Sequence, residues 1–519
     1  MRRNERLHPQ RKKLTLFMSL TLLFMNRLHL LAGLLALTAL APPALGGLRP
    51  PDPPALEAPK PPPAQISSSE GMPPLPYPAV FQKRQERKNP PQPPVLLTKI
   101  STADAEDWTR TPNDLKGLLQ WMSQEMKVNF SSNIKTFKEI SPDAERNPIL
   151  YRSGYKPFKL SDAEIRTLRE YLLNGGTVIF NALVGNPAFY QSAREAAHAI
   201  LPESPLYRVR MDHPVFHAFY EIDKVAFRSR MVKDGLVGDA RPWLDGADLD
   251  NRTAVFISRW DIALGWEANP CESWGYEDAD ARKIGANIVS YTTAMRDAGH
   301  SVGKSVELVN ADKKTAGKFR VGQIIHDGPW KTRSAAFPML LNQFHTATGT
   351  PVSFELRDVA LTDPAIFEMP FLYMTGTIDF SLTEAEVAAL RRFLANGGVL
   401  LVEAGEGRPT FDAAFRQQIA KVLPGKTLSA LPAGHEIYTK PLDASVVRAR
   451  PPLAVRRGDK IEMAPELFGI ELNGALAVIY TPNDLSAGWE HALAPYALGY
   501  ESKDATALGV NVLYYAVTH

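Results

Sequence analysis

The chain has 519 residues, 45% of them hydrophobic and 22% charged, so it is long enough for two or three domains with sizeable cores. The formal net charge of +3 comes from the first 46 residues, which hold seven Lys or Arg against one Glu. The remainder has 52 basic and 55 acidic residues, and this near-neutral balance excludes the broad positive surface typical of nucleic-acid binding. The single cysteine, Cys271, excludes an intramolecular disulfide and a cysteine metal cluster.

Residues 1–46 have the pattern of a membrane-targeting leader. A basic run at 11–13 precedes two apolar runs, at 14–25 and 28–41. One interpretation starts translation at Met25 and makes this leader a cleaved signal peptide, whereas the other keeps it as an N-terminal membrane anchor. Under both interpretations the rest of the chain is exported across the membrane. We therefore expect a periplasmic or cell-envelope protein, anchored in the inner membrane where the leader is retained.

Residues 47–94 form a proline-rich segment. Between Pro42 and Pro94 the chain holds 18 of its 43 prolines. Such a composition cannot build a packed core and favours an extended, semi-rigid spacer, so we expect a disordered linker here.

The rest of the chain is an internal duplication. At a constant offset of 222 residues, "LSDAEIRTLREYLLNGG" (160–176) matches "LTEAEVAALRRFLANGG" (382–398). Further identical residues keep the register over the whole length, with the offset growing to 223 and then 224 after single insertions. The sequence therefore predicts two copies of one domain, at 95–300 and 317–519, joined by a linker at 301–316. Representative pairs are Trp108 with Trp330, Gly185 with Gly407, His213 with His435, Asp261 with Asp484, Trp266 with Trp489, Glu267 with Glu490 and Tyr276 with Tyr500.

Strand and helix patterns alternate within each copy. The second copy has strand patterns at 318–325, 351–356, 370–376, 399–404 and 475–481, and helix patterns at 334–348, 382–396, 411–423 and 503–517. Continuous apolar runs such as "VLLVEA" are typical of strands that are covered on both faces. This alternation predicts a mostly parallel sheet between two helical layers in each copy.

The duplicated helix has recognisable start and stop signals. Thr383 with Glu386, and Ser161 with Glu164, have the spacing of a capping box. An Asn-Gly-Gly sequence ends both helices, because glycine readily takes the left-handed conformation that closes a helix.

Several stretches resemble the bacterial domain of unknown function family 4159. In the second copy these are "FLYMTG", "LAVIYTPNDLSAGWE" and "ALGVNVLYYAVTH", and in the first "ILYRSG", "DHPVFHAFYEID" and "AVFISRWDIALGWE". The resemblance implies a flavodoxin-like sandwich similar to class I glutamine amidotransferase domains. It further implies an envelope protein with von Willebrand A-type proteins as partners. The family carries no established activity.

An amidotransferase-like enzyme needs a nucleophile at the turn that follows the strand after the glycine pair. The nearest residues are Ala182 in the first copy and Ala404 in the second, so neither copy offers a thiol there. A serine elbow of the G-x-S-x-G type is also absent from the sequence.

Six polar residues that occur in both copies are the remaining catalytic candidates. A histidine with two carboxylates could bind a metal or perform acid–base hydrolysis. The structural alternative is that the aspartates cap turns and the histidines satisfy backbone groups. The candidates are His213, Asp261 and Glu267, with His435, Asp484 and Glu490.

A ligand site is the second possibility. Gly405 and Gly407 follow a strand and precede a helix, where an anion can bind, although a structural turn is the simpler explanation of both. Four aromatic residues near the same loops could stack on a sugar or grip a peptide, or they could simply pack in the core. They are Trp266, Tyr276, Trp489 and Tyr500.

From these patterns we expect a non-catalytic envelope protein that binds a partner or ligand through two tandem domains. The alternatives are a hydrolase that uses the histidine and carboxylate set, with or without a metal, and a wall-glycan-binding module. We expect no cofactor, no resident metal and no nucleic-acid partner. The expected contacts are with an envelope protein and, through the N-terminal segment, with the membrane.

Overall fold

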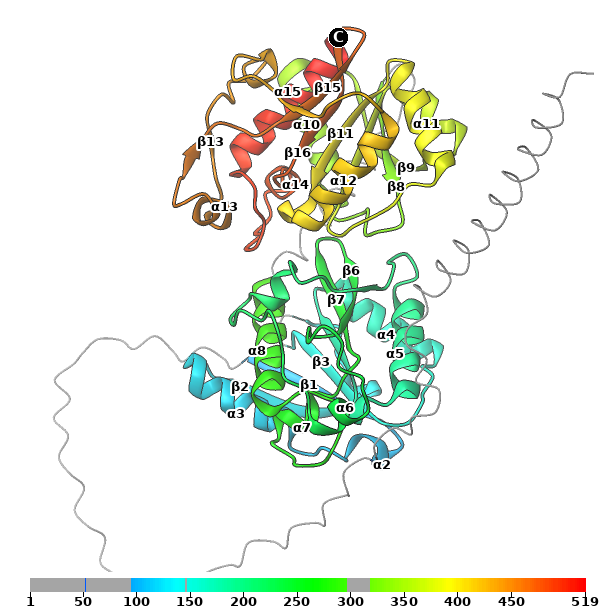
Figure 1. The fold of residues 1–519 in the computed structure, drawn as a ribbon, viewed down its shortest axis with the longest axis vertical. Coiled ribbons are helices and arrows are strands. Elements are labelled where there is room, and N and C mark those ends of the chain that lie inside the picture. Colours follow the sequence, from blue (N-terminus) through cyan, green and yellow to red (C-terminus); the bar gives the residue numbers. More distant parts are fainter. Residues whose placement is uncertain (1–51, 53–94, 145–146, 296–317) are drawn as a thin grey trace, which may run out of the picture. The chain divides into compact units, whose positions relative to one another are not determined.

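The computed structural model describes residue 52 and residues 95–144, 147–295 and 318–519 (Figure 1). They form two α/β domains, each built on its own seven-stranded sheet. The expected leader, most of the proline-rich segment and the linker at 301–316 lie outside the described residues. Within the described ranges, no helix is both long enough and apolar enough to cross a membrane.

The first sheet has five parallel strands and an antiparallel edge. Strands β2, β1, β3, β4 and β7 run parallel, whereas β6 and β5 pair antiparallel beyond β7. In spatial order the strands are β2 (Phe130–Thr136), β1 (Val95–Ser101), β3 (Ile149–Gly154), β4 (Thr177–Ala182), β7 (Arg252–Ser258), β6 (Leu244–Leu249) and β5 (Tyr207–Arg208).

The second sheet repeats this order strand for strand. Its parallel strands are β9, β8, β10, β11 and β16, and β15 and β12 form the antiparallel edge. The two sheets therefore have the same topology, as the duplication predicts. In spatial order the strands are β9 (Val352–Ala360), β8 (Phe319–Ile325), β10 (Phe371–Gly376), β11 (Val399–Ala404), β16 (Ala475–Thr481), β15 (Phe468–Leu472) and β12 (Ser429–Ala430).

Helices cover both faces of each sheet (Figure 1). The helices of the first domain are α2 (Ala105–Trp108), α3 (Asp114–Met126), α4 (Asp162–Leu173), α5 (Pro187–Ile200), α6 (Ser229–Lys233), α7 (Ala263–Trp266) and α8 (Asp278–Met295). Those of the second domain are α10 (Ala336–Thr348), α11 (Glu384–Ala395), α12 (Pro409–Val422), α13 (Pro451–Arg456), α14 (Ser486–Trp489) and α15 (Ser502–Thr518).

Alternate residues of a central strand pack into opposite cores. On β11 of the second domain, Leu401 packs against α10 and α15, whereas Leu400 and Val402 pack against α11 and α12. Because successive side chains of a strand point to opposite faces, an all-apolar strand must be covered on both sides. Each domain is therefore a three-layer sandwich, which confirms the predicted α/β fold class.

The predicted helix signals are present in the structure. Ser161 caps α4 and Thr383 caps α11, and in both cases the capping box with the glutamate three residues later is complete. Gly175 and Gly397 follow these helices with φ of 93° and 88°. Helix ends were thus readable because they depend on local backbone chemistry.

The sequence patterns missed several short elements. The antiparallel strands β5, β6, β12 and β15 were not predicted, and neither was a small hairpin formed by β13 (Val447–Arg448) and β14 (Glu462–Met463). Most are only two residues long, which is too short to produce a periodic hydrophobic signal.

Candidate functional site

The strand-to-helix turn at the centre of each sheet is the first candidate site. It joins β4 to α5 through Leu183–Gly185, and β11 to α12 through Gly405–Gly407; we call each of these turns the elbow. The middle residue of each elbow has left-handed backbone angles, with φ of 51° at Val184 and 54° at Glu406. This conformation is strained for any residue with a side chain and most of all for a β-branched one.

The elbow corrects the predicted position of the nucleophile. Ala182 and Ala404, which the sequence pattern placed there, are the last residues of their strands. The strained residue lies two positions later. Val184 and Glu406 carry neither a thiol nor a hydroxyl group, so the elbow offers no sulfur or alcohol nucleophile in either domain.

A buried aspartate fixes each elbow to the following helical turn. Asp261 accepts hydrogen bonds from the backbone N–H of Val184 at 2.7 Å and of Ala263 at 2.8 Å. Asp484 accepts the equivalent bonds from Glu406 and Ala487, both at 2.7 Å. Burial raises the pKa of Asp261 to about 6. Both carboxylates therefore serve as backbone caps, since they satisfy amides that would otherwise be buried without partners.

The second domain adds a glutamate beside this cap. Glu403 accepts hydrogen bonds from the Tyr373 hydroxyl at 2.5 Å and from the backbone N–H of Leu485 at 2.6 Å. Burial, together with the neighbouring Asp484 carboxylate, raises the pKa of Glu403 to about 7. In the first domain Asn181 fills the equivalent position as a neutral amide, and it accepts a bond from the backbone N–H of Ile262 at 3.1 Å.

A buried cation joins two of the predicted carboxylates in the second domain only. The Arg333 guanidinium lies 3.2 Å from Glu490 and 3.8 Å from Asp484, measured from nitrogen to oxygen. In the first domain the buried Lys99 pairs with Asp114 at 2.8 Å. Glu267 lies close enough for both charges to act on its pKa, but its hydrogen bonds come from the Asn113 backbone N–H and the Asn269 side chain.

The histidines lie at the other end of the sheets. His213 accepts a bond from the Val215 backbone N–H and contacts the Thr253 hydroxyl at 3.0 Å through its other nitrogen. Thr253 is near the start of β7, whereas Asp261 follows the end of this strand. At 3.3 Å per residue, roughly 16 Å of strand therefore lies between Thr253, which His213 contacts, and the end at which Asp261 lies. Burial lowers the pKa of His213 well below its usual value, which keeps the ring neutral.

His435 occupies the equivalent place in the second domain. It accepts a bond from the Ile437 backbone N–H, and its ring packs against Tyr515, whose hydroxyl accepts a bond from the start of β16 at Leu476. Asp484 follows the other end of that strand. The structure therefore does not bring either histidine together with the carboxylates that the sequence grouped with it.

The four aromatic candidates are core residues. Trp266 and Trp489 donate through the indole N–H to the backbone oxygens of Ala281 and Ala505. Tyr276 and Tyr500 are fully buried, and their hydroxyls accept backbone N–H bonds from Trp243 and Glu466. The idea that these rings stack on a sugar or grip a peptide is therefore wrong for this structure, because none of them reaches the surface.

The two glycines of the second elbow are also enclosed. A β-carbon on Gly407 would lie 2.5 Å from the β-carbon of Leu498, and one on Gly405 would lie 3.0 Å from the Gly376 carbonyl oxygen. Close packing thus explains both glycines, although Gly407 also lines a small pocket of about 140 Å³ together with Arg456 and Arg457.

Sequence reasoning missed one pair of functional side chains in this region. Arg228 donates to the backbone oxygens of Asn269 and Cys271, and Arg450 donates to those of Ala487 and Ala492. Each arginine thereby fixes the loop that follows α7 or α14. The two share the offset of 222, so the same register that paired the aspartates could have identified them.

Metal ligation has no geometric support in the part of the chain that the structure describes. No group of three or more His, Cys, Asp or Glu side chains is placed to hold an ion there. In the second domain Asp484 and Glu490 lie on Arg333, which already supplies positive charge beside them.

Three comparisons place the chain among known proteins. No curated protein matches it. Among solved structures it is similar to a "putative phosphosugar isomerase" from Silicibacter pomeroyi DSS-3, with 12% sequence identity, 60% of this chain and 75% of that chain covered, and a TM-score of 0.15, which is too low to support any argument. The model of the family described as Domain of unknown function (DUF4159) matches residues 96–293 and again 320–517. The chain therefore belongs to this family and carries two tandem copies of its domain.

Proposed function

We propose that the protein is a non-catalytic component of the cell envelope, whose two amidotransferase-like domains bind a partner. The observation that carries this proposal is the elbow. The position where such a fold would present a nucleophile holds Val184 in one domain and Glu406 in the other. The carboxylate oxygens of Asp261 and Asp484 accept hydrogen bonds from backbone N–H groups. These groups maintain the fold and are not free for substrate.

The amidotransferase-like relationship is part of the proposal. It is supported by the central parallel strands β4 and β11, which each pass through a strained elbow into a long helix. The elbow places its middle residue, Val184 or Glu406, at the carboxyl edge of the sheet, where α/β proteins bind their ligands. In this chain the loops that follow α7 and α14 pack against the elbow glycines Gly185 and Gly407 at this edge.

The envelope location and the membrane-side partner rest on the sequence. The charged and apolar leader at 1–46 and the proline-rich spacer at 47–94 together suit a protein that is exported and held at a distance from a membrane. By family resemblance, a von Willebrand A-type protein is the first partner to examine.

The test compares binding with hydrolysis in the full-length protein. We expect a tagged chain to be protected from protease added outside intact cells, to become accessible when the outer membrane is permeabilised, and to co-purify reproducibly with one envelope protein. The Glu406→Gln variant should retain that partner, because glutamine keeps the shape of the side chain and its amide oxygen can still accept a bond from the buried Arg408, which pairs with Glu406 at 2.8 Å. Hydrolytic turnover that disappears in Glu406→Gln, while the variant remains folded, would overturn the proposal.

A further inference from the structure

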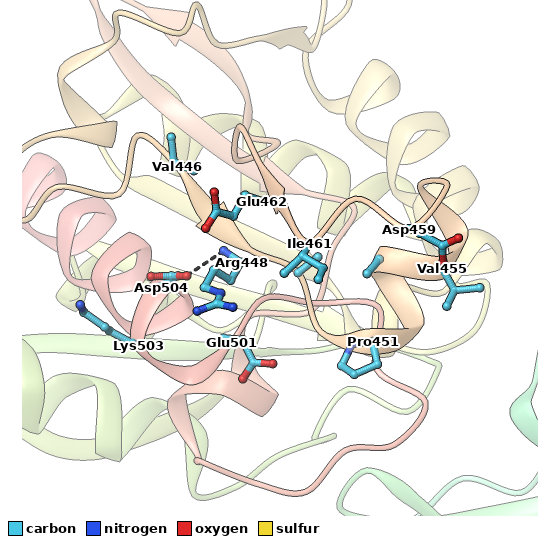
Figure 2. A pocket seen from close by; sticks show the side chains of 12 residues that line it. Val446, Arg448, Pro451, Val455, Asp459, Ile461, Glu462, Glu501, Lys503 and Asp504 are labelled. Carbon is cyan, nitrogen blue, oxygen red and sulfur yellow. Dashed lines mark hydrogen bonds between the residues drawn. The ribbon is translucent and has the colours of Figure 1, made fainter.

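A surface groove of about 900 Å³ opens beside α13 in the second domain (Figure 2). It lies between this helix, the β13–β14 hairpin and the first turn of α15; we call it the α13 groove. Three β-branched side chains of its lining are strongly exposed: Val446 at 59%, Val455 at 69% and Ile461 at 55%. Exposed apolar side chains that gather around one concave surface mark an interaction site more often than scattered ones do.

The first domain serves as an internal control for this surface. At the offset of 222 that also pairs Arg228 with Arg450, Val446 corresponds to Lys224 and Val455 to Lys233. Both lysines are exposed. The same fold therefore accepts a charged side chain at these two positions, so folding does not require the valines.

Charge defines what the groove can accept. Four carboxylates line it, from Asp459, Glu462, Glu501 and Asp504, against the cations of Arg448 and Lys503. The Asp504 carboxylate already accepts a bond from the backbone N–H of Arg448 at 2.7 Å. The lining has net negative charge and includes no aromatic ring, which disfavours anionic lipid headgroups and sugars.

The hairpin supplies a backbone edge as well. β13 is covered on one side, because its Arg448 oxygen accepts a bond from the Glu501 backbone N–H at the start of α15. On its other side it pairs with β14, and these two strands form a two-stranded sheet. No other described strand pairs with the outer edge of β14, which is two residues long, and an extended peptide can pair with such an edge.

We propose that the α13 groove binds an extended segment of a partner protein in which lysine or arginine residues alternate with apolar ones. The apolar side chains pack on Val446, Val455 and Ile461, and the basic ones face Glu462, Glu501 and Asp459. This assignment rests on the binding role proposed above and specifies its surface and the chemistry of the partner.

The experiment measures binding of labelled peptides to the full-length protein in detergent by fluorescence anisotropy. The probes are a decapeptide of alternating Lys and Val and a matched one of alternating Glu and Val. We expect the Lys–Val peptide to bind at least tenfold more tightly, and we expect this preference to shrink as salt is raised.

Variants locate the site. The double change Val446→Lys and Val455→Lys imports the first domain's own residues and should weaken binding of the Lys–Val peptide at least tenfold. Val517→Lys, at a valine that is 44% exposed near the end of α15 and outside the groove, should leave it unchanged. Equal affinity for the two peptides, no binding of either, or full binding by the double variant would each overturn the groove assignment.

Capture of the envelope partner separates this inference from the proposed function. A double variant that still captures the partner shows that the groove is the wrong surface, while the binding role stands. Failure of the wild-type protein to capture any partner counts against the binding role itself.

Discussion

Asp261 and Asp484 are the side chains on which the elbows depend. Each spans two segments that lie far apart in the chain, and each is almost completely buried. A carboxylate suits this position because it accepts several backbone N–H bonds at once. Sequence spacing identified both aspartates, but it could not distinguish a catalytic acid from a cap, since the distinction depends on which amides face the oxygens.

Removing this cap should destabilise the first domain. Asp261→Ala leaves the amides of Val184 and Ala263 buried without acceptors, at about 1–3 kcal/mol for each unsatisfied group. We expect the free energy of unfolding to fall by roughly 2–5 kcal/mol, measured by urea denaturation. Asp239→Ala, which removes an exposed ion pair with Arg241 and an exposed hydrogen bond from its backbone N–H, should change it by less than about 1 kcal/mol. Comparable losses in the two variants would contradict the capping role.

Glu403 should make the second domain sensitive to pH. Its pKa is about 7 when folded, above the usual value of 4.5, so the folded state binds the proton more tightly than the unfolded state does. The stabilisation is fully present below pH 4.5 and is lost as the pH rises through about 7, a change on the order of 3 kcal/mol.

Glu403→Gln provides the check on this pH dependence. It imitates the neutral amide of Asn181, which the first domain uses at the same place. The fall in unfolding free energy between pH 5 and 8 should therefore become smaller. What remains is the part contributed by Asp261, whose pKa is also raised, and the opposite part contributed by His213 and His326, whose pKa values burial lowers. An unchanged pH profile in this variant would show that Glu403 is ionised throughout.

At the scale of elements, contact with a neighbouring loop decides which glycine positions have no room for a side chain. Gly407 and Gly397 both have positive φ, at 68° and 88°, but only Gly407 lies against another segment. The elbow packs under the loop that follows α14, whereas the helix stop faces open space. A sequence reader sees two similar glycines, because the contact that distinguishes them is made by Leu498, some ninety residues later.

These two glycines should differ in their response to alanine. Gly397→Ala should cost about 1 kcal/mol, which is the conformational penalty of a left-handed residue. Gly407→Ala adds a β-carbon 2.5 Å from the β-carbon of Leu498, so we expect an additional loss of about 1–3 kcal/mol from overpacking. The measurement is the unfolding free energy of each variant. Equal values would mean that the loop carrying Leu498 shifts at no cost to make room for the added β-carbon.

At the scale of the whole molecule, several residues shared by the two copies perform the same task in each, although Glu490 pairs with Arg333 whereas Glu267 accepts bonds from Asn113 and Asn269. The aspartates cap the elbows, the tryptophans bond to the next helix, and Asn287 and Asn511 bond to the backbone of the loops at Tyr220 and Leu442. Shared identity therefore marks what the fold needs. Features that differ between the copies, such as the exposed Val446 and Val455 of the α13 groove in place of Lys224 and Lys233, are better candidates for what the protein recognises.

Separate cores lead to a prediction about unfolding. Each hydrophobic cluster in the described part of the chain draws its side chains from one domain. We expect calorimetry to resolve two transitions, with Asp261→Ala lowering the midpoint of one and Gly407→Ala that of the other. A single transition lowered by both variants would instead show that the domains unfold as one unit.

The sequence by itself determined the duplication, the α/β class, the capped helices and the lack of a thiol or serine elbow. These properties depend on local periodicity, on backbone preferences of glycine and capping residues, and on residue identity, all of which are written along the chain. Only the tertiary structure decided that the aromatic residues are buried, that the histidines lie at the far end of the sheets, and that the strained elbow residues are Val184 and Glu406. Those facts depend on which distant segments meet at each sheet edge, and a linear pattern does not contain that information.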